Sequence, residues 1–146
     1  MAGIGGYAPR RGGGKLFLDA EELRTFALHK DARRDRNLRP FCVHPALLWA
    51  ARLHTRDMIQ RNYFSHITKG TRDDPCDRIR RQGYRYRYCA ENIGSYPTPD
   101  SMFKAWMNSP GHRANILNSK YREIGIGLDN RPSGNLVFTV DFGTRL

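Results

Sequence analysis

The chain has 146 residues, of which 39% are hydrophobic and 11% aromatic, and its formal net charge is +11. This length suits one globular domain with a real core and is too short for two full-sized domains. The sequence contains no run of about 18 apolar residues that would predict a membrane-spanning helix. Its three cysteines are too few to staple a chain of this size as a disulfide scaffold.

The N-terminal segment is rich in glycine and lacks the apolar stretch of a secretory signal. We therefore expect residues 1–14 to form a flexible leader outside a single domain at residues 15–146. The absence of a signal does not establish a cytosolic location, because the chain can be the mature fragment of a secreted protein.

Two helices are predicted in the first part of the domain. Asp19 and Glu22 have the spacing of a capping box, and Asn37, which tolerates the left-handed conformation, marks the end of the first helix. A second helix begins at Pro45, and its apolar residues repeat at helical spacing to about Asn62. The basic side chains near the end of the first helix are expected to form a solvated face: Arg33, Arg34 and Arg36.

The rest of the chain mixes short helices with strands. Cap residues followed by proline predict helix starts at Thr98-Pro99 and Ser109-Pro110, and a short helix is predicted from Pro75 to Gln82. Strands are predicted at residues 84–88, 123–128 and 136–142. This order indicates an α+β fold in which helices cover a small antiparallel sheet.

The cysteines leave two interpretations open. Cys42, Cys76 and Cys89 form no CxxC pair and no Cys/His cluster with zinc-site spacing. Cys76 and Cys89 are close enough in sequence for a disulfide across a short excursion, which would require an oxidising compartment and leave Cys42 as a small buried residue. The alternative is three reduced thiols in a cytosolic protein.

Positive charge is concentrated in residues 1–90, which carry 19 basic and 9 acidic residues. An Arg-rich face favours an anionic partner, such as an acidic cell-envelope polymer or a lipid, although solubility alone also explains it. Nucleic acid is a weaker prediction, because the alternating Arg and Tyr residues at 84–88 are ordinary for a strand.

Three polar residues are candidates for chemistry, since GxSxG, HExxH and P-loop motifs are absent. His66 lies in a loop, Glu91 lies in an apolar stretch, and His112 is the third residue of the helix that Ser109 is expected to cap. A helix N-terminus keeps imidazole neutral, and neutral imidazole binds metal. Zn²⁺ accepts two His nitrogens with a carboxylate or water, whereas the alternative is a structural hydrogen bond for each His.

Several motifs occur in one order over about residues 19–143: Tyr63-Phe64-Ser65-His66, Ala90-Glu91-Asn92-Ile93, Ser109-Pro110-Gly111-His112-Arg113 and Gly125-Ile126-Gly127. With them the sequence resembles the bacterial branch of the CAP superfamily (cysteine-rich secretory proteins, antigen 5, pathogenesis-related group 1), also called the SCP domain. The resemblance implies a three-layer α–β–α sandwich with a central antiparallel sheet flanked by helices.

The resemblance also implies a cleft with two histidines and two acidic residues. His66 and His112 match the two histidines, and Glu91 matches one acid. The second acid falls at Ser109, so the chain keeps three of the four positions, which weakens an acid–base role for the set. Two further histidines match the family pattern and are interpreted as structural: His29 and His54.

Together these features predict a secreted or cell-envelope protein that binds an unidentified ligand in its cleft, and they favour binding over catalysis as its role. His66 and His112 would hold Zn²⁺, with Glu91 as a third ligand or as the group that orients a bound water. One alternative is a zinc-dependent peptidase or other hydrolase with Glu91 as the base. Another is a basic module that binds an anionic envelope polymer or lipid.

Overall fold

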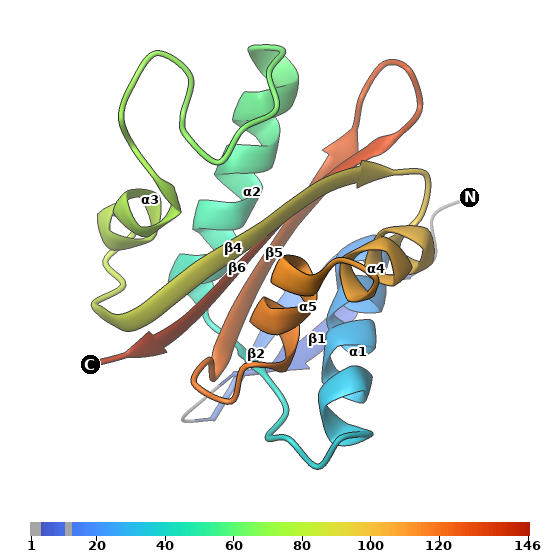
Figure 1. The fold of residues 1–146 in the computed structure, drawn as a ribbon, viewed down its shortest axis with the longest axis vertical. Coiled ribbons are helices and arrows are strands. Elements are labelled where there is room, and N and C mark those ends of the chain that lie inside the picture. The colour runs from blue at the N-terminus through green and yellow to red at the C-terminus, as the bar shows by residue number, and fades with distance from the viewer. Residues whose placement is uncertain (1–3, 11–12) are drawn as a thin grey trace.

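The computed structural model describes residues 4–10 and 13–146 (Figure 1). Within these ranges, helices lie on both faces of a twisted sheet. The elements in chain order are β1 Gly6–Pro9, β2 Lys15–Leu18, α1 Ala20–Arg34, β3 Cys42–Val43, α2 Pro45–Gln60, α3 Pro75–Arg81, β4 Tyr86–Tyr96, α4 Pro99–Met107, α5 Pro110–Leu117, β5 Glu123–Asn130 and β6 Leu136–Arg145. No helix among the described residues is both long and apolar enough to cross a membrane.

The central sheet has the strand order β3-β5-β6-β4. Its long strands are antiparallel, as predicted, with β6 between β4 and β5. The edge strand β3 runs parallel to β5 and was not predicted, because two residues are too few to show an alternating pattern. β4 is also longer than predicted and extends through Glu91 to Tyr96.

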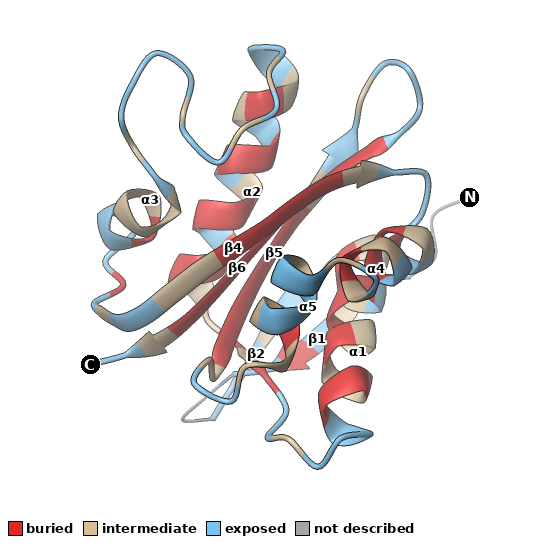
Figure 2. Ribbon diagram, viewed as in Figure 1, coloured by how far each residue is buried: buried red, intermediate tan, exposed pale blue. Residues whose placement is uncertain are grey.

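Helices form a layer on each face of the sheet, which confirms the α–β–α sandwich. α2 covers one face with α3 beside it, and α1, α4 and α5 cover the other (Figure 1). The most buried residues follow the long strands between these layers (Figure 2). Gly125 and Gly127 permit the close approach of α2, since a Cβ on Gly125 would lie 2.0 Å from the backbone carbon of Leu47.

The predicted helix starts hold in the structure. Asp19 and Glu22 form a complete capping box at α1, and Thr98 caps α4 through its side chain. Asn37 follows α1 with a φ of 56°, the left-handed conformation expected of it. His44 caps α2 by accepting a hydrogen bond from the amide of Ala46, 3.0 Å away.

The expectation of a flexible leader is wrong for residues 6–9. They form β1, which pairs with β2 in an antiparallel hairpin. Ala8 is 1% exposed and belongs to the main hydrophobic core, so this part of the glycine-rich segment is folded onto the domain. Residues 1–3 and 11–12 of the expected leader lie outside the described residues.

The expectation that Arg33 lies on a solvated face is also wrong. Its side chain is fully buried, and its guanidinium lies 4.0 Å from the ring centroid of Phe41. Burial lowers the pKa of Arg33 to about 10. The guanidinium is retained because it donates to four backbone carbonyls, those of Arg39, Ile116, Asn118 and Tyr121. It therefore fastens α1 to the segment that follows α5.

Candidate functional site

Glu91 lies at the centre of the candidate site on β4, with its side chain only 1% exposed. One carboxylate oxygen, Oε1, is 2.8 Å from His66 Nδ1, and the other, Oε2, accepts a hydrogen bond of 2.7 Å from Arg78. The sequence predicted that His66 and Glu91 belong to one site, and the fold does bring them into contact. Glu91 belongs to the central sheet, whereas His66 belongs to the connection between α2 and α3.

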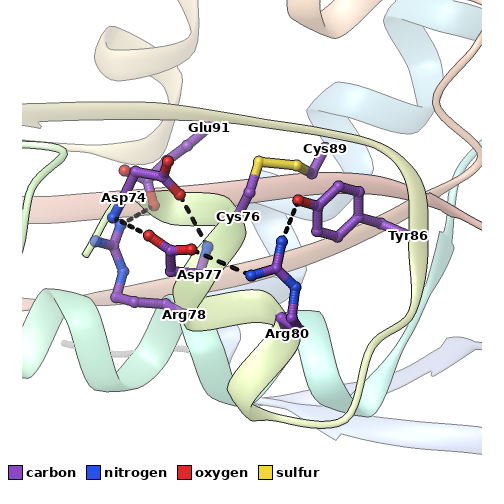
Figure 3. Close-up of a disulfide and its surroundings, with 8 residues drawn as sticks. All are labelled: Asp74, Cys76, Asp77, Arg78, Arg80, Tyr86, Cys89 and Glu91. Atoms are coloured by element: carbon purple, nitrogen blue, oxygen red, sulfur yellow. Dashed lines mark hydrogen bonds and ion pairs between the residues drawn. A yellow bond between two sulfur atoms is a disulfide. The ribbon is translucent and has the colours of Figure 1, made fainter. Parts of the chain in front are cut away.

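Arg78 is the member of this site that the sequence did not mark. It lies on α3 with its side chain 11% exposed, and it places a guanidinium beside the buried Glu91 (Figure 3). Nothing in the sequence separates this arginine from the other arginines of the Arg-rich segment. A buried acid in an apolar strand needs a cationic partner, so the sequence indicated that some basic residue must contact Glu91 without indicating which one.

A second carboxyl group faces Glu91 from the neighbouring strand. Asp141 of β6 is the cross-strand partner of Glu91 and is fully buried. No donor from the described residues reaches either oxygen of Asp141, an environment that favours the protonated carboxyl, which can donate to Glu91. Two residues fifty positions apart could not be paired from the sequence, because strand register is a property of the fold.

The two carboxyl groups have opposite pKa shifts. Burial and the nearby charge of Glu91 raise the pKa of Asp141 well above its ordinary value. Burial also opposes ionisation of Glu91, but hydrogen bonds from His66 and Asp141 and the charge of Arg78 outweigh it, and the pKa of Glu91 is lowered. The pair therefore consists of an ionised Glu91 and a neutral Asp141.

His112 lies on the other side of β4, at the start of α5. Its Nδ1 is 2.9 Å from the hydroxyl of Ser109, and its carbonyl accepts a hydrogen bond of 3.1 Å from Asn92. Burial, followed by the proximity of His66, lowers the pKa of His112. The expected neutral state agrees with this direction, to which burial and a second imidazole both contribute.

Ser109 has a different role from the one expected. It occupies the N-cap position of α5, yet its side chain makes no capping hydrogen bond. Its hydroxyl instead contacts His112, as described above. The adjacent residues Glu91 and Asn92 thus point to opposite faces of β4. Glu91 contacts His66 and Arg78, and Asn92 donates a hydrogen bond to the carbonyl of His112 in α5.

A cavity of about 470 Å³ opens beside His112 between β4, α4 and α5. Its walls are largely apolar and aromatic, and Ser109, His112 and Arg131 supply polar groups. His66 and Glu91 are not among its lining residues. The fold therefore joins His66 to Glu91 and His112 to the cavity, while the three predicted residues do not line one common cavity.

Among the candidate site residues, two histidine side chains are available as metal ligands. Within residues 4–10 and 13–146, no group of three or more His, Cys, Asp or Glu side chains is spaced to hold a metal ion. Both oxygens of Glu91 are already engaged, so Glu91 is placed to orient a ligand and not to be one. His66 and His112 each use Nδ1 in a hydrogen bond, and neither Nε2 has a hydrogen-bond partner in the described part of the chain.

The remaining family-matching histidines are buried, as the structural interpretation requires. His29 is enclosed by aromatic rings and its Nδ1 is 2.8 Å from the carbonyl of Thr25 in its own helix. His54 is 1% exposed, and its Nε2 is 2.8 Å from the carbonyl of Ser65. His54 thereby holds the backbone next to His66.

The structure joins Cys76 to Cys89 in a disulfide with a Cα–Cα distance of 5.9 Å (Figure 3). Cys42 is a free cysteine in the edge strand β3. It is only half-buried, which differs from the small buried residue expected from the sequence.

Comparison with known proteins identifies relatives across most of the chain. Residues 26–142 match the cysteine-rich secretory protein family, CAP. The uncharacterized protein YkwD of Bacillus subtilis (strain 168) is 37% identical over 111 residues, which is 75% of this chain and 43% of YkwD. The chain thus spans less than half the length of the curated relatives it matches.

Solved structures share the fold at lower sequence identity. An extracellular protein of Bacillus anthracis str. Ames that contains an SCP domain has a TM-score of 0.77 at 23% identity, over 93% of this chain and 48% of that protein. An outer surface protein of Borrelia burgdorferi has a TM-score of 0.79 at 21% identity, over 98% of this chain and 100% of that protein.

Proposed function

The chain belongs to the CAP family of cysteine-rich secretory proteins, and from that premise we propose that it is a secreted or envelope-facing binding module. We further propose that His66 and His112 would hold one Zn²⁺. The Cys76–Cys89 disulfide favours an oxidising compartment. The SCP-domain protein of Bacillus anthracis is extracellular, which supports the same location.

The contact between His66 Nδ1 and the buried carboxylate of Glu91 is the observation that carries the metal proposal. An ionised carboxylate accepts only, so Nδ1 carries a proton, and in the neutral ring the Nε2 lone pair of His66 is then available to a metal. A carboxylate that orients a histidine in this way is the usual outer partner of a zinc ligand. The hydroxyl of Ser109 can fix the same tautomer in His112 by accepting from Nδ1.

When bound, zinc would supply a Lewis acid with coordination positions open to a ligand. His66 and His112 would hold it, and Glu91 would orient the His66 ring through its contact with Nδ1. The cavity beside His112 would take the ligand, with its aromatic wall providing apolar contact.

Binding is favoured over hydrolysis by the state of Glu91. A general base needs an accessible oxygen and a pKa near the working pH. Glu91 is buried, both of its oxygens accept hydrogen bonds, and its pKa is lowered, so it is a poor proton acceptor. The zinc-dependent hydrolase therefore has less support from this geometry than a passive binding site.

A zinc titration of metal-stripped protein by calorimetry tests the proposal. We expect saturable binding of one Zn²⁺, abolished in the His66→Ala/His112→Ala double variant. The matched control is His44→Asn, because Asn preserves the helix cap that His44 provides. Glu91→Gln should weaken binding by about 10–100-fold. The absence of saturable binding by the wild-type protein would overturn the proposal.

A further inference from the structure

The connection of residues 61–74, between α2 and α3, carries His66 without a helix or strand of its own. One side chain of the following helix spans it. The Arg78 guanidinium donates to three groups of this connection: the His66 carbonyl at 2.6 Å, Thr68 Oγ1 at 3.2 Å and the Asp73 carbonyl at 3.4 Å. Because Arg78 also donates to Glu91, it ties the connection to the site carboxylate.

A covalent bond joins the two elements that meet at the Arg78–Glu91 pair. Cys76 precedes Arg78 by two residues on α3, and Cys89 precedes Glu91 by two residues on β4 (Figure 3). Residues two apart on a strand face the same side, so Cys89 and Glu91 both point toward α3. The disulfide therefore sets the distance between the helix and strand that present the ion pair.

α3 has few other attachments to the domain: Arg81 forms an ion pair with Asp73 of the connection, and Arg80 donates to the hydroxyl of Tyr86 on β4. It has seven residues, fewer than an isolated helix needs for stability in water. Ile79 is its buried residue, and it packs in a small cluster with Ala46, Leu47 and Tyr84. Its capping box, Asp74 with Asp77, is internal to the helix and holds nothing else in place. The position of Arg78 thus depends strongly on the disulfide.

We propose that the Cys76–Cys89 disulfide and the Arg78–Glu91 pair form a clasp that holds the His66-bearing connection over the site and opens when the disulfide is reduced. A dithiol reductant would supply two electrons and two protons. The sulfur–sulfur bond would break to give two cysteine thiols, and the reductant would close to its own disulfide. Arg78 is a positioning residue in this scheme, and the disulfide regulates the ligand affinity of His66. The effect on zinc rests on the proposed function, whereas the effect on the connection does not.

Amide hydrogen exchange tests the clasp without any ligand. The amides of Thr68 and Thr71 report on the connection, since they donate to the carbonyls of Asp73 and Thr68. We expect both to exchange at least about ten-fold faster after reduction with dithiothreitol and in the Cys76→Ser/Cys89→Ser variant. Amides of β5 and β6 should keep their rates. Cys42→Ser should behave like the wild type before and after reduction.

Two arginines of the same helix provide a matched pair. Arg78→Met should release the connection with the disulfide intact, whereas Arg80→Met should not, because Arg80 is exposed and its contacts are with Asp77 and Tyr86. Arg78→Lys keeps the charge but not the planar fork, so it should restore only part of the protection. If Arg78→Met fails to fold, reduction of the wild-type protein still decides the outcome.

The results separate the clasp from the zinc site. Unchanged exchange of Thr68 and Thr71 after reduction would overturn the clasp, whatever zinc does. Faster exchange with zinc affinity reduced about ten-fold or more would support both parts. Faster exchange with unchanged zinc affinity would refute the regulation and retain the clasp. If oxidised protein binds no zinc, the proposed function fails while the exchange data still judge the clasp.

Discussion

The two faces of the central sheet bury different kinds of side chain. Toward α1, α4 and α5, β6 presents Phe138, Val140 and Phe142, which join one large apolar core. Toward α2, the same strand presents Val137, Thr139 and Asp141, and the last two are fully buried polar residues. One strand therefore supplies stability on one face and the polar groups of the candidate site on the other, at residues that alternate along the chain.

Several groups on the polar face have hydrogen-bond partners. Thr139 is bonded to Thr55 of α2 at 2.8 Å, and Glu91 receives donors from His66 and Arg78. Burying such groups without partners would cost several kcal/mol each, in the range of about 2–7 kcal/mol. This difference predicts that substitutions on the apolar face mainly change the free energy of unfolding. Substitutions on the α2 face should mainly change the pH dependence of stability and the candidate site.

Truncation on the apolar face should have the largest effect on stability. Phe142 is fully buried and its ring contacts the rings of Phe41, Tyr121 and His29. Phe142→Ala should lower the free energy of unfolding by about 3–5 kcal/mol, because it removes buried contacts and leaves a cavity. Chemical denaturation measures this loss. A change below about 1 kcal/mol would show that this face is not the main core.

The packing of α2 on the sheet should be the next most sensitive feature. Gly125→Ala would place a Cβ against the backbone of Leu47, so α2 must shift, at a cost of about 1–3 kcal/mol or more. Gly111→Ala is the matched control, since a Cβ there would meet open space. That control should be neutral or stabilising by up to about 1 kcal/mol, because Ala favours helices. Equal losses in the two variants would contradict the close approach of α2.

The smallest effect should be a change in the pH dependence of stability. The raised pKa of Asp141 means that the folded state keeps a proton which the unfolded state loses above its own pKa, about 3.9. This carboxyl therefore makes the protein less stable as pH rises from about 4 toward the folded pKa. Glu91, with a lowered pKa, has the opposite effect and stabilises the fold above its unfolded pKa.

Asp141→Asn separates these two contributions. Asn retains a donor for Glu91 but cannot ionise, so the variant should lose the decline in stability that begins near pH 4, while the stabilisation due to Glu91 remains. Denaturation of both proteins at several pH values measures the difference. Identical pH profiles for the wild type and the variant would show that Asp141 does not hold a proton in the folded state.

Local signals in the sequence were sufficient for most of the fold. The capping box of Asp19 and Glu22, the cap at Thr98 and the strands at the C-terminal end all depend on neighbouring residues, and the structure contains them. β1 was missed because glycine and proline mask the strand pattern. The burial of Arg33 was missed because three of its four carbonyl partners lie more than eighty residues away along the chain.

The candidate site was predictable only in part, for the same reason. Motif resemblance pointed to His66, Glu91, Ser109 and His112. It did not reveal Arg78 or Asp141, whose roles depend on the position of α3 and on the β4–β6 register. It also did not predict that Ser109 contacts His112 in place of the helix amides. The sequence pointed to four residues of the candidate site, and tertiary contacts added Arg78 and Asp141.

The most direct test of this account is the tautomer of His66, measured by ¹⁵N NMR of the imidazole nitrogens in oxidised, metal-free protein near neutral pH. Where the ring is neutral, its proton is predicted on Nδ1, because that nitrogen faces the carboxylate of Glu91 and a proton there leaves Nε2 free for a ligand. A neutral ring with its proton on Nε2 would contradict the account, since Nδ1 could not then donate to Glu91 and the Nε2 lone pair would be lost.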